Sequence, residues 1–191
     1  MDLEPIKQAL FKLHPLEEEE WQAFAAHLTL KYFGKGEYLI REGQIENHVH
    51  FLLQGSTRHY FIREGKDYTV DFQFKGEFIT AYYSLITGEP SEIFIEALEE
   101  TRTISIQANR LKEFYDKSHN SERIGRIIAE NQYINRLRRE MALLSQTAEQ
   151  RYATLLEKNP GLISQLSVKH LSSYLGVQPE SLSRIRKAAR N

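Results

Sequence analysis

Seven glycines, at positions 34, 36, 43, 55, 65, 76 and 88, divide the first half of the chain into short segments. Several of these segments are rich in β-branched and aromatic residues, namely 38–40, 49–53, 58–62, 68–74, 93–97 and 103–106. Short strands with a turn residue about every ten positions are typical of an antiparallel sandwich or barrel. We therefore predict a jelly-roll-like β-barrel over residues 31–107.

Helical periodicity flanks this region on both sides, so the predicted fold class is α+β. Before it, Trp21, Phe24 and Leu28 recur at helical spacing and predict an amphipathic helix over residues 17–30. After Asn109, helical spacing returns in residues 110–117 and then in a long segment over residues 121–145.

The long segment carries a narrow apolar stripe, which predicts a dimerisation helix. Its repeat of seven residues is set by Ile127, Ile134, Met141 and Ala148, with Leu137 and Leu144 between them. A stripe of this period allows two helices to pack along a seam. We expect a homodimer with Ile127, Ile134, Leu137, Met141 and Leu144 in the interface. The alternative is that the stripe packs on the chain's own barrel.

The last part of the sequence predicts a helix-turn-helix. A helix over residues 148–158 precedes a stop signal at Asn159-Pro160-Gly161. Two short helical segments follow, 168–175 and 179–189, joined through Gly176 and with Pro179 in the first turn of the second. Two short helices joined in this way have the pattern of a helix-turn-helix.

Charge is distributed unevenly along the chain. Residues 1–117 hold 13 Lys and Arg against 20 Asp and Glu, whereas residues 118–191 hold 12 against 6. The formal net charge of −1 therefore hides an acidic body of −7 and a basic tail of +6. This asymmetry favours contact of the tail with a polyanion such as double-stranded DNA, although chance asymmetry on solvated helices is the plainer explanation.

The second of the two short helices carries side chains suited to DNA. Glu180 and Arg184 are four residues apart and share a helix face. Glutamate accepts from cytosine N4 and arginine donates to guanine O6 and N7, so the pair is able to contact adjacent bases. A surface ion pair within the helix is the alternative. The full set of predicted DNA contacts is Gln178, Glu180, Ser181, Arg184, Arg186, Lys187 and Arg190.

Three motifs together carry a family resemblance. FLLQG at positions 51–55 and FKGEF at 74–78 resemble parts of a cyclic-nucleotide-binding barrel, and LGVQPESLSRIRK at 175–187 resembles the recognition element of Crp/Fnr regulators. The resemblance covers nearly the whole chain in the family's order. It implies a sensor domain at 1–117, a dimerisation helix at 118–147 and a (winged) helix-turn-helix domain at 148–191. It also implies a homodimeric transcription regulator, with RNA polymerase as a further partner.

Some positions depart from the family pattern. Glu180 and Arg184 match its base-reading positions, but Pro179 stands where another basic contact often lies. In members that bind cyclic AMP, a glutamate contacts the ribose and an Arg-Ser pair binds the phosphate. The resemblance places the effector contacts at Gly76, Glu77, Phe78, Ser91, Glu92, Arg136 and Leu137.

The effector is not expected to be cyclic AMP. Glu77 matches the glutamate, but Ser91 and Glu92 replace the Arg-Ser pair, and a carboxylate repels the ligand's phosphate. Either another small molecule binds, such as an anionic aromatic or acyl compound, or the barrel is filled by its own side chains. For a ligand, the candidate contacts are Tyr82, Tyr83, Arg102 and Arg136.

Other function classes are less well supported. The chain has no cysteine, which excludes disulfides, thiolate zinc sites, cysteine-ligated iron–sulfur clusters and cysteine nucleophiles. No nucleophile-elbow or phosphate-loop spacing occurs, so we expect neither an enzyme nor a cofactor. The pair His48 and His50 leaves a cupin-type metal site as an alternative, but Gln54 stands where its acid is expected.

Localisation and one competing function complete the predictions. No apolar run approaches the roughly 20 residues of a membrane span, and the first residues lack signal-peptide order, so we expect a cytoplasmic protein without membrane contact. The competing function is a ligand-binding interaction module that docks on another protein and does not read DNA sequence.

Overall fold

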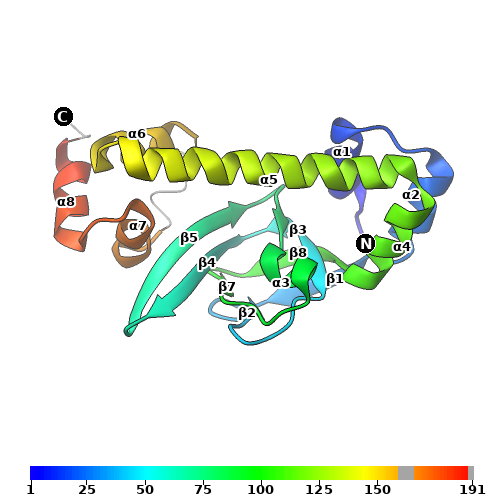
Figure 1. Ribbon diagram of the computed structural model, residues 1–191, viewed down its shortest axis with the longest axis horizontal. Helices are drawn as coiled ribbons and strands as arrows, with labels where there is room; N and C mark the ends of the chain where they lie inside the picture. Colours follow the sequence, from blue (N-terminus) through cyan, green and yellow to red (C-terminus); the bar gives the residue numbers. More distant parts are fainter. Residues whose placement is uncertain (159–165, 189–191) are drawn as a thin grey trace. The chain divides into compact units, whose positions relative to one another are not determined.

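The computed structural model describes residues 1–158 and 166–188 (Figure 1). The chain divides into two compact units. The first comprises Met1–Phe61 and Asp71–Glu130, and the second comprises Ile62–Val70 and Asn131–Asn191. Each unit is built from segments that are distant in the sequence.

Two four-stranded antiparallel sheets form the predicted barrel. In the first sheet the strand order is β1 (Thr29–Phe33), β8 (Thr101–Gln107), β3 (His48–Gln54) and β6 (Phe78–Ile79). In the second the order is β2 (Tyr38–Ile40), β7 (Phe94–Ala97), β4 (Ser56–Arg63) and β5 (Lys66–Phe74). The predicted jelly-roll architecture and the α+β class are confirmed.

Alternation along β3 gives the first sheet two different faces, because successive side chains of a strand point to opposite sides. Leu52 is fully buried and packs with Ile79 and Ile95, which come from both sheets, so this face points into the barrel. The neighbouring Phe51 packs instead into a cluster formed by helices. His50 shares the side of Leu52 and therefore faces the barrel interior.

Helices α1 (Glu4–Leu13), α2 (Glu18–Ala25) and α4 (Ala108–Lys117) cover the outer face of the first sheet. Ile6, Leu10, Trp21 and Phe24 are buried in this cluster together with Phe51. The sequence did not predict α1. The predicted helix over 17–30 is too long, since Thr29 and Leu30 belong to β1 and pair with β8.

One short helix inside the barrel domain was also not predicted. Helix α3 (Tyr82–Thr87) follows β6 and ends at Gly88, whose φ of 73° is left-handed. Six residues hold too few repeats for a helical periodicity to be recognised in the sequence.

The remaining helices follow the sequence closely. Helix α5 (His119–Ser145) begins in the first unit and continues into the second. Helices α6 (Ala148–Lys158), α7 (Val168–Leu175) and α8 (Pro179–Ala188) lie in the second unit. They agree with the predicted ranges, and within the described residues after α5 there is no strand. The stop signal at 159–161 lies outside the described residues.

Candidate nucleic-acid interface and effector barrel

The junction of α7 and α8 has the geometry of a helix-turn-helix. At the start of α7, the Ser167 hydroxyl accepts from the backbone N of His170 at 3.1 Å. At its end, Gly176 takes a left-handed φ of 70°, which a side chain would make costly. The backbone N of Val177 then donates to the Ser172 carbonyl at 3.0 Å and closes the turn.

A small apolar core fixes the angle between the two helices. Leu171 and Leu175 of α7 and Leu182 of α8 are almost completely buried, and Ile185 is 6% exposed. Tyr152 of α6 is buried as well, and α6 contacts both helices. Burying side chains of this size contributes about 1.5–3 kcal/mol each. These buried residues therefore fix the position of α8, while the opposite face of the helix is left to other side chains.

That opposite face of α8 presents most of the predicted DNA contacts to solvent. Gln178, Glu180, Arg184 and Lys187 are exposed, and Ser181 and Arg186 are half-buried. Arg184 Nη2 donates to the Ser181 hydroxyl at 3.3 Å, and no ion pair joins it to Glu180 among the residues described. Arg190 lies outside the described residues.

The outer part of the β4–β5 hairpin is bonded to α7 within the second unit. The Ser173 hydroxyl accepts from Thr69 N at 2.8 Å and donates to the Asp67 carbonyl at 2.9 Å. Lys169 Nζ lies 3.1 Å from the Asp67 carboxylate. Residues 62–70 of the hairpin, which belong to the second unit, thus contact the first helix of the helix-turn-helix through side chain and backbone.

Two arginines of the basic tail bind the carbonyl groups at the end of α7. Arg139 Nη2 donates to Tyr174 O at 3.0 Å, and its guanidinium lies 3.8 Å from the centre of the Tyr174 ring. Arg151 Nη2 donates to Leu175 O at 2.7 Å. The last carbonyls of a helix lack partners within the helix. Part of the basic charge of the tail therefore stabilises α7 itself.

The apolar stripe of α5 is largely exposed in the single chain. Ile134 and Leu137 are each 42% exposed, Met141 is 58% exposed and Leu144 is 83% exposed, whereas Ile127 is half-buried. Stripes of this kind on a surface mark a site of association.

The predicted ribose contact, Glu77, lies in the turn between β5 and β6. Its carboxylate accepts from the backbone N of Phe74 at 2.8 Å, and its side chain is exposed. Gly76 takes a φ of 92°, and its N donates to Leu52 O at 2.8 Å. Phe78 packs against the Phe51 ring on the helix side of the sheet. Gly76 and Glu77 shape the turn, and Phe78 begins β6.

The predicted phosphate contacts are turned onto the protein's own backbone or into solvent. Ser91 is buried, and its hydroxyl donates to Ile93 O at 2.9 Å. Glu92 is exposed, so a carboxylate and no cation stands at this place. Arg136 and Leu137 belong to α5 in the second unit and are exposed.

The tyrosines proposed for the barrel are not core residues. Tyr82 is 50% and Tyr83 is 55% exposed, and the Tyr83 hydroxyl donates to the Glu89 carboxylate. Arg102 is exposed and lies over the ring of Tyr32. If the barrel is filled by its own side chains, Tyr82 and Tyr83 are not among them.

A buried carboxylate that the sequence analysis missed stands at the start of α3. Glu46 accepts from the backbone N of Asn47 and of His48 at 3.0 Å each, and from Ala81 N at 3.1 Å. Burial raises the pKa of Glu46, and these hydrogen bonds oppose that rise. Ala81 is the N-cap residue of α3, 35 positions away, so no local sequence pattern indicates the contact.

The barrel interior near β3 contains two histidines in a polar environment. His50 Nδ1 lies 2.7 Å from the Ser105 hydroxyl, and burial lowers the pKa of His50 to about 3. The His48 ring stacks on that of His50, and burial lowers its pKa too. In the described chain, no three His, Asp or Glu residues cluster as metal ligands, so the cupin alternative gains no third ligand.

Comparison with known proteins gives one sequence family and several related folds. Residues 30–118 match the family of cyclic nucleotide-binding domains. No curated protein sequence matches the chain. Across residues 1–158 and 166–188, no helix is both long and apolar enough to cross a bilayer.

Three similar solved structures come from bacteria, and two of them are described as regulators. FixK2 from Bradyrhizobium japonicum has a TM-score of 0.76 and 20% identity, covering 85% of this chain and 84% of its own. The c-di-GMP-responsive global regulator CLP from Xanthomonas campestris has a TM-score of 0.70 and 17% identity, and the match covers 91% of this chain and 92% of CLP. A putative Crp/Fnr-family transcriptional regulator from Eubacterium rectale has a TM-score of 0.73 and 15% identity, and the match covers 92% of this chain and 84% of that protein.

Together these matches show the fold that the Crp/Fnr resemblance implies. The family match places a cyclic nucleotide-binding domain at residues 30–118, and the structural matches extend over most of the chain. At 15–20% identity, the structural matches show a common fold.

Proposed function

We propose that this chain, which has a cyclic nucleotide-binding domain in a Crp/Fnr fold, is a transcription regulator that binds double-stranded DNA as a homodimer. The observation that carries the proposal is the exposed face of α8. The role consists of binding, with no catalytic step, and such a regulator acts in the cytoplasm with RNA polymerase as a partner.

The exposed face of α8 has the chemistry that a DNA-reading helix requires. Glu180 and Arg184 stand four residues apart and make no ion pair with each other, so both remain able to bond to bases. Lys187 follows on the same helix and provides a cation for phosphate. The buried Leu171 and Leu182 hold this face rigidly, which direct base contact needs.

The apolar stripe of α5 supports the homodimer. Leu144 is 83% exposed and Met141 58%, which is unfavourable in a monomer. Pairing of two copies along this stripe removes that surface from water and duplicates α8 about a two-fold axis. We therefore expect the DNA site to be an inverted repeat with half-sites about one helical turn apart.

The effector is proposed to be a small molecule other than cyclic AMP, or the regulator works without one. The exposed Glu92 and the bonded Ser91 support this, because neither compensates a phosphate charge. Glu77 supports it as well, since its carboxylate is engaged with Phe74 N in the turn.

The experiment that tests DNA reading compares two substitutions in α8. Duplexes selected from a random pool by the wild-type protein are titrated by mobility shift at fixed salt, with a scrambled duplex alongside. Arg184→Ala is expected to cost roughly 1–3 kcal/mol and to relax preference at one base pair per half-site. Lys187→Ala is expected to weaken binding to both duplexes alike.

Lys112→Ala is the matched control, because Lys112 is an exposed cation of α4 in the first unit. It is expected to leave binding unchanged. Equal losses from Arg184→Ala and Lys187→Ala on both duplexes would show non-specific binding. A folded dimer that enriches no duplex at all would favour the interaction module.

A further inference from the structure

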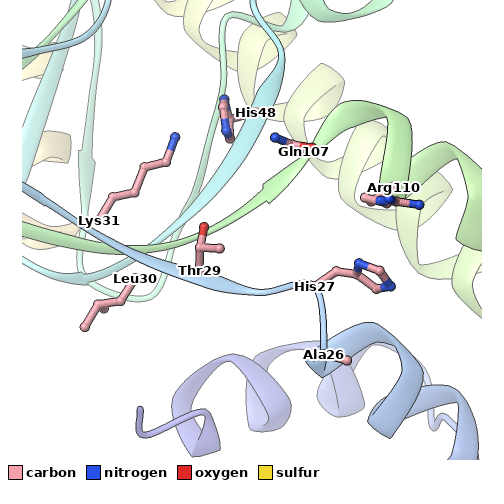
Figure 2. Close-up of a pocket in the computed structure, with 8 residues that line it drawn as sticks. All are labelled: Ala26, His27, Thr29, Leu30, Lys31, His48, Gln107 and Arg110. Atoms are coloured by element: carbon pink, nitrogen blue, oxygen red, sulfur yellow. The ribbon is translucent and has the colours of Figure 1, made fainter.

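A cavity of about 520 Å³ opens in the first unit where β1 and β3 begin and β8 ends (Figure 2). Apart from Ala26 and Leu30, its wall consists of His27, Thr29, Lys31, His48, Gln107 and Arg110. None of these residues is among the effector contacts that the sequence placed at 76–78, 91–92 and 136–137. The cavity is therefore a separate site.

The lining of this cavity is basic and contains no carboxylate. Lys31, Arg110 and two histidines come from three different stretches of the sequence, 27–31, 48 and 110. Arg110 is partly neutralised, since both oxygens of Glu113 lie 3.0 Å from its Nη1. The ring of His27 packs against Phe114 and forms a wall. The cation without such a partner is Lys31.

Lys31 is a half-buried cation in an unfavourable setting. In the described part of the chain its ammonium has no hydrogen-bond acceptor and no ion pair, and burial lowers its pKa. The charge of Glu46 raises the pKa of Lys31, but by less than burial lowers it. The Glu46 oxygens already accept from three backbone N atoms. A desolvated cation without a hydrogen-bonded anion is costly, and a bound anion removes that cost.

Three donor groups converge on one side of the sheet. Figure 2 shows the Lys31 ammonium, the His48 ring and the Gln107 amide projecting from β1, β3 and β8 toward the same space. The β3–β8 register pairs His48 directly with Gln107. The ring nitrogens of His48 have no hydrogen-bond partner among the described residues, so they are available to a ligand.

We propose that this pocket binds a small phosphate monoester, with the phosphate between Lys31, His48 and Gln107. A terminal phosphate has three strong acceptor oxygens, one for each of these donors. Leu30 points to the opposite face of β1 and packs in the helix cluster, so Thr29, on the same side as Lys31, is the neighbour left for the organic part. The volume of about 520 Å³ is within the range of small-molecule sites.

The test is an NMR titration of the full chain, free of DNA, with glycerol 3-phosphate, inorganic phosphate and acetate in separate arms. We expect saturable shifts of the Lys31, His48 and Gln107 signals with both phosphates. Lys31→Met keeps the alkyl stem and is expected to weaken phosphate binding roughly tenfold to a hundredfold. Lys35→Met, at an exposed position beyond the end of β1, is the control and should leave it unchanged.

His48→Gln is the second variant and is expected to weaken phosphate binding as well. The proposal is overturned if no saturable shift appears, if acetate binds as tightly as phosphate, or if Lys31→Met and Lys35→Met bind phosphate equally. Because no DNA is present, these outcomes are independent of the proposed DNA binding.

Discussion

The helix-turn-helix and the segment 76–92 both carry predicted ligand contacts, yet their polar side chains differ in whether they are already hydrogen-bonded to the backbone. On α8, Glu180 and Arg184 are exposed and do not pair with each other. In the barrel segment, Glu77 binds Phe74 N and Ser91 binds the Ile93 carbonyl. The first region is prepared for an external partner, whereas the second satisfies its polar groups internally.

This difference shows that a fold and its ligand chemistry are determined by different residues. Buried apolar residues such as Leu52 and Ile95 maintain the barrel whether or not a ligand binds. Recognition of a cyclic nucleotide depends on a few polar side chains, and these can change without loss of the core. A ligand at 76–92 would have to break hydrogen bonds to the backbone at Phe74 N and Ile93 O, whereas DNA at α8 meets a longer side-chain hydrogen bond from Arg184 to Ser181.

The largest expected effect is a loss of stability in the helix-turn-helix alone, because that region and the barrel have separate apolar cores. Leu182→Ala leaves a cavity between α7 and α8 and is expected to cost about 2–5 kcal/mol. We expect loss of DNA binding and faster amide exchange in α7 and α8. The fluorescence of Trp21, the single tryptophan and a residue of the first unit, should report an unchanged urea transition of the barrel.

Ser183→Ala is the control for this substitution, since Ser183 is exposed on the same helix. It should change stability by less than about 0.5 kcal/mol. Leu52→Ala is the reciprocal variant and should shift the Trp21 transition. An equal shift of that transition by Leu182→Ala would show that the two units unfold together and would break the comparison.

The next effect concerns the polar interior of the barrel and depends on pH. The folded protein holds His50 neutral down to a pKa of about 3, whereas the unfolded chain binds a proton near the usual 6.5. The unfolded state therefore binds more protons between these values, and stability is lost as the pH falls below about 6.5. From pH 7 to 5 we expect a loss of about 2 kcal/mol from this residue.

Urea unfolding of His50→Gln at pH 7 and pH 5 measures this contribution. The substitution keeps a polar partner for Ser105 and removes the titration, so its loss between the two pH values should be smaller than that of the wild type. His119→Gln, at an exposed side chain, should retain the wild-type loss. The same pH dependence in His50→Gln and wild type would contradict the assignment to His50.

The smallest expected effect is that of cyclic AMP on the barrel. A ligand with a dissociation constant of about 1 μM would stabilise the protein by about 4 kcal/mol at roughly 1 mM. We expect no change in the Trp21 transition at that concentration. Glu77→Gln should also have little effect, because its amide oxygen still accepts from Phe74 N. A cyclic AMP shift that disappears in Glu77→Gln would show that the segment is a working nucleotide site.

Local patterns in the sequence were sufficient for the elements that depend on neighbouring residues. Helices α6 and α7 have the predicted bounds, because their periodicity and the turn at Gly176 are written within a few positions. The order of barrel, long helix and helix-turn-helix was likewise predicted. The helix over 17–30 was overextended because Leu28, which lies in the connection between α2 and β1, is buried in the same apolar cluster and continues the helical spacing.

Tertiary structure alone decided which polar groups are engaged and which are available. The basic charge of the tail is visible in the sequence, but only the fold assigns Arg139 and Arg151 to the carbonyls of α7. The contact of Glu46 with Ala81 and the approach of Lys31 to His48 likewise join residues far apart in the chain. Hydrogen bonds and desolvation act over a few ångströms, and the sequence alone does not specify those distances.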